Sequence, residues 1–342
     1  MAEIINTVVF PICRRDRILT ALETLHENTP FNYKTVVVDQ TEPEPEGFAF
    51  ERQLWDSCDV VIKPHLNYGF AQAVNMGLDM ARTKYATVCN DDVEFIPGHD
   101  WWAGIEATFE KFPKAAAVNP QTPKCPGWGW AEPGFRYMVP KGWPEPQLRR
   151  WGAHSRELQI EFRDVRLKAH KLSQDGAEDS ALESKLRSLR REMIAHRERM
   201  APLVYQATMA GPEYVQMLGD EGNWAVIDGF PCWLSVFRSD RLREIGFFDE
   251  RFWPGGGEDY DMMARAYQAG YRMLASSKSW AWHWWGQSKD RSDGRARALP
   301  AAHEHWNVLS VKAGLDGLWI PDCSVWGDNC TRTDSRVVRK SL

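Results

Sequence analysis

Four short and mostly apolar runs, separated by other segments, organise the first part of the chain. They lie at residues 7–13, 35–39, 59–62 and 85–89. Runs of this length are typical of buried strands, and between the first two runs apolar side chains recur at helical spacing. Strands that alternate with helices form a parallel sheet whose strands are joined by crossover helices. The sequence therefore predicts an α/β fold built on a mostly parallel sheet.

The fourth run ends abruptly in Asn90, Asp91 and Asp92. In an open α/β sheet the ligand crevice lies outside the carboxyl ends of the strands, so we expect these acids to lie in a cleft. Two adjacent carboxylates repel one another unless a cation neutralises them. Oxygen ligands favour a hard divalent ion such as Mg²⁺ or Mn²⁺. A solvated turn is the alternative, because Asp and Asn are also ordinary turn residues.

Composition limits the class of protein and the partners it can have. The formal charge of -5 at pH 7 gives no general case for nucleic-acid binding, although a local basic patch is compatible with it. The seven cysteines include no C-x-x-C pair, which favours reduced thiols and a cytoplasmic location. No signal peptide and no apolar run long enough to span a membrane is visible. The 17 tryptophans can pack in a core or stack on sugar rings and bases.

A glycine-containing segment follows the third predicted strand. Gly69 stands where a helix is expected to open, and Asn67 and Asn75 are expected near the crevice. A helix amino terminus beside a sheet edge suits a phosphate, because its free N–H groups and the positive end of its dipole point outward. A helix whose small residues pack closely against the sheet is the simpler interpretation, and it does not exclude a ligand.

A second group of acids lies in the second half of the chain. Three glycines at 255–257 precede Glu258, Asp259 and Asp261, and the helix predicted to begin there ends at Gly270. Glycine lets the backbone approach a substrate closely. An acid at a helix amino terminus is also stabilised as the anion. These acids can therefore either serve a site or simply cap the helix.

The segment at residues 147–200 differs in character from the rest of the chain. It contains no proline and holds thirteen Lys and Arg against nine Asp and Glu. Its apolar residues fall at helical spacing on both sides of a break at 173–176, which predicts an inserted α-helical hairpin. A solvated antiparallel pair, self-association into a homo-oligomer, and docking of an acceptor macromolecule all fit this pattern.

The motifs, taken in order, resemble one known family. The resemblance is carried by the segments 11–15, 36–39, 67–77, 90–92, 246–261 and 283–288. The last of these reads H-x-x-G-x-S from His283. This order is similar to that of family 2 glycosyltransferases with the A-type (GT-A) fold, a Rossmann-like, mostly parallel sheet flanked by helices. Asn90 stands where that family often has Asp.

The resemblance implies a metal-dependent, inverting transferase that uses a nucleoside diphosphate sugar, with uridine as the expected nucleoside. Asp92 and His283 are the implied ligands of Mn²⁺ or Mg²⁺, and Asp259 is the implied catalytic base beside Glu258. The implied contacts to the donor are Pro11, Arg15, Asp39, Asn67, Gly69, Asn75 and Asp91. The implied contacts to the acceptor are Trp253, Gly257 and Trp285.

On this interpretation the chain has four segments. Residues 1–146 form the nucleotide-sugar half, 147–200 the inserted hairpin, 201–290 the acceptor and catalytic half, and 291–342 a tail that can act as a lid. The acceptor hydroxyl can belong to a glycan, a protein side chain or a hydroxymethylated base in DNA. A nucleotide-sugar hydrolase, a nucleotidyltransferase and a non-catalytic binding module of the same fold are the alternatives.

Overall fold

The computed structural model describes residues 3–42, 48–122, 137–142, 179–218, 225–226, 232–253, 255 and 258–284, together with single residues between 154 and 172. These residues fall into two compact units. The first is drawn from residues 1–121 and 224–321, and the second is drawn from residues 122–223.

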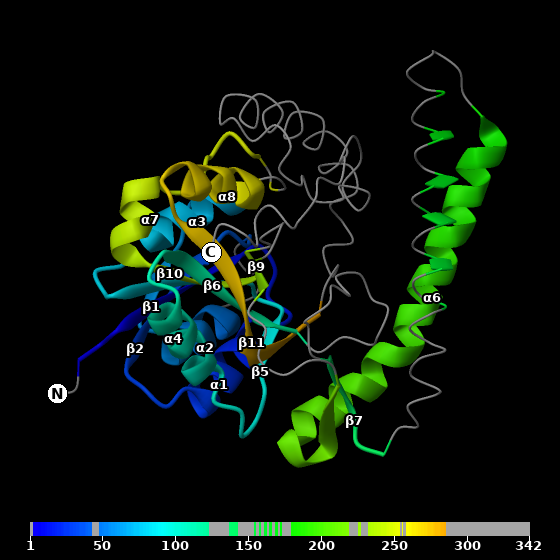
Figure 1. Ribbon diagram of the computed structural model, residues 1–342. Coiled ribbons are helices and arrows are strands. Elements are labelled where there is room, and N and C mark those ends of the chain that lie inside the picture. Colours follow the sequence, from blue (N-terminus) through cyan, green and yellow to red (C-terminus); the bar gives the residue numbers. More distant parts are fainter. Residues whose placement is uncertain are drawn as a thin grey trace. The chain divides into compact units, whose positions relative to one another are not determined.

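The first unit contains a sheet and six helices among its described residues (Figure 1). Its strands are β1 (Asn6–Ile12), β2 (Tyr33–Asp39), β3 (Val60–Ile62), β4 (Tyr85–Cys89), β5 (Val93–Phe95), β6 (Ala115–Gln121), β9 (Ala225–Val226), β10 (Leu234–Arg238) and β11 (Arg272–His283). Its helices are α1 (Ile18–Asn28), α2 (Ala49–Ser57), α3 (Phe70–Leu78), α4 (Trp101–Lys111), α7 (Ser239–Ile245) and α8 (Glu258–Gln268).

The sheet has the strand order β3-β2-β1-β4-β10-β6-β11-β5, and β9 pairs with β11. The four strands β3, β2, β1 and β4 are parallel, as the alternating sequence pattern predicts. Strand β10 then runs antiparallel between β4 and β6. Strand β11 is parallel to β6 and antiparallel to β5. The GT-A class of mixed α/β sheet flanked by helices is therefore present in this unit.

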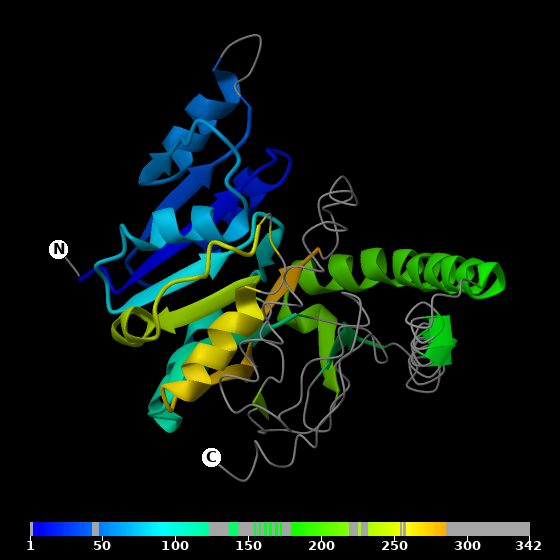
Figure 2. The same cartoon turned by 90° about the horizontal axis from the view of Figure 1, so that it is seen from above.

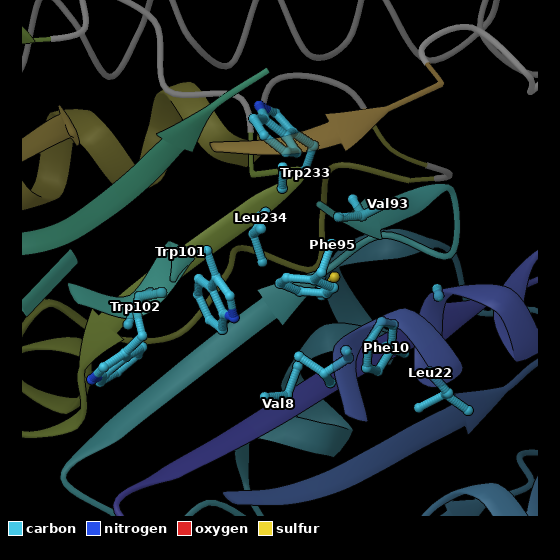
Figure 3. Close-up of a cluster of buried hydrophobic side chains, with 14 of the residues drawn as sticks. Val8, Phe10, Leu22, Val93, Phe95, Trp101, Trp102, Trp233 and Leu234 are labelled. Atoms are coloured by element: carbon cyan, nitrogen blue, oxygen red, sulfur yellow. The ribbon is translucent and has the colours of Figure 1, made fainter. Parts of the chain in front are cut away.

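Helices cover both faces of this sheet. One buried cluster joins α1, α2 and α4 to side chains such as Val8 and Phe10 of β1. The other cluster joins α3, α7 and α8 to the opposite face through Val9. Successive strand residues point to opposite faces, so a strand that is apolar at every position buries both of its faces. Figure 3 shows the first cluster, in which Phe95 of β5 packs beside Trp101 of α4.

Several elements escaped the sequence analysis. Strand β5 is only three residues long, and α2 begins just after the loop that the Pro- and Glu-rich residues predict. The long strand β11 was not expected either, because polar residues at 276–279 interrupt its apolar pattern and its pairing with β6 shifts register there. The mostly apolar sequence at 226–238 predicts one strand. The structure has β9 at the start of this stretch and β10 at its end, with 227–231 outside the described residues.

The second unit is built on one long helix, α6 (Ser180–Ala210), which Figure 2 shows as a continuous ribbon. Strands β7 (Tyr137–Pro140) and β8 (Val215–Leu218) pair antiparallel, and a short 3₁₀ turn, η1 (Pro212–Tyr214), leads from α6 into β8. The Asp179 carboxylate caps α6 by accepting hydrogen bonds from the amides of Ala181 and Leu182 at 2.8 and 3.2 Å.

Helical residues also occur between positions 154 and 172, and they contact α6. Lys185 Nζ lies 2.7 Å from a carboxylate oxygen of Glu161. Leu158 and Leu189 are both buried. Helix α6 continues ten residues beyond position 200, where the predicted hairpin ends, and Pro202 lies inside it. The hairpin at 147–200 and its role in self-association stay predictions.

Candidate active site

The candidate site lies at the edge of the first unit's sheet where β1, β2, β4 and β6 end. Because β10 is antiparallel to β4, its first residue, Leu234, lies opposite the last residue of β4, Cys89. The turn before β10 therefore reaches the same edge. The amide of Asn90 donates a hydrogen bond of 2.8 Å to the Trp233 carbonyl, which joins the acidic loop after β4 to that turn.

Asp92 and His283, the two predicted metal ligands, lie side by side at this edge. Asp92 Oδ1 and His283 Nε2 are 3.1 Å apart, and the two side chains are only 10% and 9% exposed. The pairing of β5 with β11 places Val93 opposite His283. The imidazole also stacks on the Trp233 indole, with ring centres 4.9 Å apart and planes 8° from parallel.

The Asp92 carboxylate is held in its ionised form. Burial raises its pKa, but attraction to His283, a hydrogen bond from His283 and attraction to Arg14 together outweigh burial, so that the pKa is below its usual value. An ionised carboxylate is the form that a metal requires. Because the folded pKa is lowered, the interaction stabilises the fold at neutral pH, and this contribution is lost as the pH falls below about 3.8.

The pair fits a divalent cation. A carboxylate oxygen and an imidazole nitrogen are a donor set that suits Mn²⁺. Two ligands at right angles around an octahedral ion, each at about 2.1 Å, are about 3 Å apart. Among the described residues no group of three His, Cys, Asp or Glu side chains is placed to hold a metal. Two protein ligands therefore leave positions for substrate oxygens and water.

The second acidic pair, Glu258 and Asp259, begins helix α8 and lies near the same edge. Glu258 is buried and Asp259 is partly buried. Burial raises the pKa of the Cys232 thiol, and repulsion from the carboxylates of Asp259 and Glu258 raises it further. Both acids therefore lie close to Cys232, the neighbour of Trp233. The turn at residues 232–233 thus contacts His283 through Trp233, and its Cys232 feels the charges of the α8 acids.

Two side chains fasten the loop at residues 246–249 that precedes these acids. Arg265 of α8 donates hydrogen bonds of 2.9 to 3.0 Å to the carbonyls of residues 245, 246 and 247, and it forms a 2.7 Å ion pair with Asp261. Asn75 of α3 accepts a bond from the Phe248 amide at 3.0 Å and donates one to the Phe248 carbonyl at 2.8 Å. The Asn75 amide, predicted to contact the donor, thus bonds to the protein backbone.

Asp39, the last residue of β2, lies at the same sheet edge and is only 1% exposed. Lys63 Nζ donates a 2.7 Å hydrogen bond to one of its oxygens, and the Thr41 amide donates a 2.9 Å bond to the other. Arg15 Nε contacts the Thr41 hydroxyl at 3.2 Å. The structure therefore brings Asp39 and Arg15 together around the loop after β2, and it adds Lys63 as a neutralising partner.

The remaining predicted donor residues surround the start of α3 and the end of β1. The Asn67 side chain accepts a 2.9 Å bond from the amide of Gly69, whose φ of 85° is one that glycine readily adopts. Pro11 is buried in β1 opposite Val38, and Asp91 is partly buried beside Asp92. Trp253, a predicted acceptor residue, is 58% exposed. Gly257 and Trp285 lie outside the described residues.

Sequence reasoning missed two residues that shape this edge. Gln40 is buried, accepts a 2.8 Å bond from the Tyr68 amide and donates a 3.3 Å bond to the Gly69 carbonyl, so it ties β2 to the start of α3. Lys63 follows β3, the strand next to β2. Its place at the end of a neighbouring parallel strand is a signal that could have identified it as the partner of Asp39.

Comparisons with known proteins agree with this fold. The structure of GalNAc-T7 with UDP, GalNAc and Mn²⁺ has a TM-score of 0.50 at 11% identity, covering 91% of this chain and 54% of that one. This chain thus spans about half the length of GalNAc-T7. The mannosyltransferase PcManGT of Pyrobaculum calidifontis, in complex with GDP-Man and Mn²⁺, has a TM-score of 0.47 at 13% identity, covering 91% and 69% of the two chains. TarS 1–349 of S. aureus has a TM-score of 0.48 at 12% identity, covering 90% and 65%.

The fold and the polar edge place the protein in the GT-A class. Residues 7–160 match the family model described as Glycosyl transferase family 2. The resemblance predicted from the motifs is thereby confirmed over residues 7–160, and the fold is that of the GT-A class. The curated proteins contain no match. Among the helices that the structure describes, none combines the length and the apolar character needed to cross a membrane.

We term the hydrogen bonds that Arg265 and Asn75 make to the loop before α8 the clamp. Substitution of Arg265 tests this clamp directly. We expect Arg265→Lys to lower the free energy of unfolding by about 1–3 kcal/mol, because one ammonium group cannot reach three carbonyls and a carboxylate together. Urea unfolding measures the loss. Arg243→Lys is the matched control, since Arg243 makes a 2.7 Å bond to the Ala81 carbonyl and its replacement should cost about 0.5 kcal/mol or less. Equal losses in the two variants would contradict the clamp.

Proposed function

We propose that this protein is a metal-dependent, inverting glycosyltransferase that moves a sugar from a uridine diphosphate donor to an acceptor hydroxyl. One observation carries the proposal: a single sheet edge holds the Asp92–His283 pair at the spacing of metal ligands and the Glu258–Asp259 pair beside it. The family match over residues 7–160 supports the reaction class. The UDP, GalNAc and Mn²⁺ bound to GalNAc-T7 support the donor class and the cation.

In this proposal Asp92 and His283 hold Mn²⁺ or Mg²⁺ next to the donor diphosphate. When bound, the cation offsets the negative charge that develops on the departing nucleoside diphosphate. Asp39, whose charge is balanced by Lys63, contacts the nucleoside from the end of β2. Arg15, Asp91 and the start of α3 at Gly69 complete the donor side, where amide groups and basic side chains suit phosphate oxygens.

Asp259 is the proposed base. Its carboxylate takes the proton from the acceptor hydroxyl while that oxygen attacks the anomeric carbon, and the bond from this carbon to the diphosphate oxygen breaks. A single displacement of this kind inverts the configuration at the anomeric carbon. Glu258 lies beside the base. The clamp of Arg265 and Asn75 supports the base's position by holding the loop that leads to α8.

The exposed Trp253 supports an uncharged glycan as the acceptor. The turn after β1 carries Arg14, Arg15 and Arg17 on the donor side. Residues 246–261 contain five acids and one arginine, and they include the exposed Trp253. Glu258 and Asp261 are buried and Asp249 pairs with Arg251, so the support comes from the exposed indole, which can stack on a sugar ring. DNA with hydroxymethylated bases is the second candidate acceptor, favoured by the surplus of four positive charges at 147–200.

Removing the metal carboxylate should abolish metal-dependent donor binding. We expect UDP-sugar with Mn²⁺ to raise the melting temperature of the wild type, since saturation at about 100 times Kd adds about 2.7 kcal/mol to its stability. Chelator should remove this shift, and Asp92→Ala should lack it. Asp79→Ala, which removes an exposed acid at the end of α3, should keep it. A shift of equal size with chelator would contradict the metal site.

Neutralising the proposed base should separate chemistry from binding. We expect Asp259→Asn to lower the transfer rate by about 10²–10⁴-fold, because the amide cannot take the acceptor proton. Donor binding measured by thermal shift should stay at the wild-type level. Glu110→Gln, which changes an exposed acid of α4, is the matched control and should stay active. Unchanged transfer in Asp259→Asn would remove Asp259 as the base, and release of free sugar without any acceptor would favour a hydrolase.

Salt dependence should distinguish the two acceptor classes. A DNA acceptor releases condensed counterions on binding, so its apparent affinity falls by about 0.9 log unit per phosphate contact for each tenfold rise in salt. A neutral glycan releases no such counterions. We therefore expect kcat/KM for a glycan acceptor to change by less than about threefold between 50 and 200 mM salt. Transfer to hydroxymethylated DNA with a steep salt dependence would overturn the glycan assignment.

A cytoplasmic location, a protein side chain as acceptor and a lid formed by the tail stay predictions from the sequence.

A further inference from the structure

Glu94 is a buried carboxylate that the proposed reaction does not use. It lies in the middle of β5, two residues after Asp92, and only 4% of it is exposed. Its neighbours Val93 and Phe95 point into the apolar cluster shown in Figure 3. Because side chains alternate along a strand, Glu94 lies on the opposite side of β5 from these two residues. A buried carboxylate is costly unless it is paired and hydrogen-bonded, so its partners show what it does.

Its partners are Trp284 and Arg17, which come from two other parts of the first unit. The Trp284 indole Nε1 donates a 2.5 Å hydrogen bond to Glu94 Oε1, between residues 190 positions apart. Arg17 Nη1 lies 3.6 Å from the same oxygen. The Arg17 guanidinium also lies 4.3 Å from the centre of the Trp284 ring, a cation–π distance. Glu94, Arg17 and Trp284 therefore contact one another, and we term this trio the latch.

The latch is connected to both proposed metal ligands. Trp284 directly follows His283, and its backbone amide donates a 3.0 Å bond to the Asp92 carbonyl. Trp284 is thus hydrogen-bonded to Asp92 through its backbone and to Glu94 through its side chain. The pairing of β5 with β11 that sets Val93 opposite His283 extends over only three residues on β5. Short strand pairs are marginally stable without side-chain support.

We propose that Glu94 is a positioning residue that acts through Arg17 and Trp284. The latch fixes the end of β11 against β5 and so keeps Asp92 and His283 at the spacing of metal ligands. Any sliding of His283 away from Asp92 would carry Trp284 with it and would remove the indole hydrogen bond from a buried carboxylate. The role in metal binding rests on the proposed function, whereas the role in holding the strand pair does not.

The test uses the full-length protein with Trp284→Phe, which removes the indole N–H, and Glu94→Gln, which removes the charge that faces Arg17. Trp102→Phe is the matched control, because it also reduces a buried indole, one that packs against Phe31 and Tyr85 and not against β5. Amide hydrogen exchange is followed by mass spectrometry in the metal-free protein, on peptides that cover 90–96 and 280–284. The affinity for Mn²⁺ in the presence of UDP is measured by electron paramagnetic resonance.

We expect faster exchange in both peptides for Trp284→Phe and Glu94→Gln, and wild-type exchange there for Trp102→Phe. Both latch variants should bind Mn²⁺ about tenfold more weakly, as is typical when a residue that orients a metal ligand is changed. The double variant should lose little more than the worse single variant, because both changes break one interaction.

The outcomes separate the latch from the proposed function. Unchanged exchange at 90–96 and 280–284 overturns the latch, even if the variants bind Mn²⁺ weakly. Exchange that accelerates equally over the whole first unit also overturns it, because it indicates general destabilisation. Faster exchange confined to the two peptides supports the latch even if the wild type binds no Mn²⁺, a result that overturns only the metal site of the proposed function.

Discussion

The candidate site depends on one short strand pairing, that of β5 with the end of β11. Strand β5 returns immediately after the acidic loop that ends β4, and this return sets Val93 opposite His283. Without it, Asp92 would end an ordinary strand-to-loop turn, which is the alternative that the sequence leaves open. A three-residue pairing thus places Asp92, from a common turn sequence, beside His283 from a distant part of the chain, and the two form the centre of the candidate site.

The antiparallel strand β10 has a comparable role for the second pair of acids. It enters the sheet between β4 and β6, so the turn at Cys232 and Trp233 lies at the edge where the parallel strands end. Trp233 stacks on His283, and Cys232 lies near Asp259. A parallel strand in this position would end at this edge rather than begin there. The direction of one strand therefore decides that the turn at Cys232 and Trp233 lies at this edge.

The sequence predicted the elements that carry a continuous apolar pattern and missed those that do not. Strands β1, β2 and β4 are apolar runs ending in polar residues, and α8 begins at acids and ends before a glycine, so local signals were sufficient. Strand β5 is too short for a periodic signal, and Glu94 in its centre is atypical of a buried strand. The contacts of Arg265 with the carbonyls of residues 245–247, and those of Glu94, join residues far apart in sequence, which no local pattern can reveal. The sequence therefore predicted the acids themselves but not the residues that hold them.

Four buried acids at or near this edge each lie beside a basic side chain. Asp39 is paired with Lys63, Asp92 with His283, Glu94 with Arg17, and Asp261 with Arg265. Desolvation makes such pairs poor sources of net stability, whereas breaking one by removing a partner is expensive. The pairs therefore raise the free energy of any alternative arrangement that would separate the elements they join. Three of the pairs join residues from two different elements or loops. The Asp261–Arg265 pair lies within α8, but Arg265 also donates hydrogen bonds to the backbone at 245–247. The candidate site draws its residues from many segments. Apolar packing beneath the sheet constrains the strands but not the polar residues at their ends, so the pairs are needed to hold these residues in place.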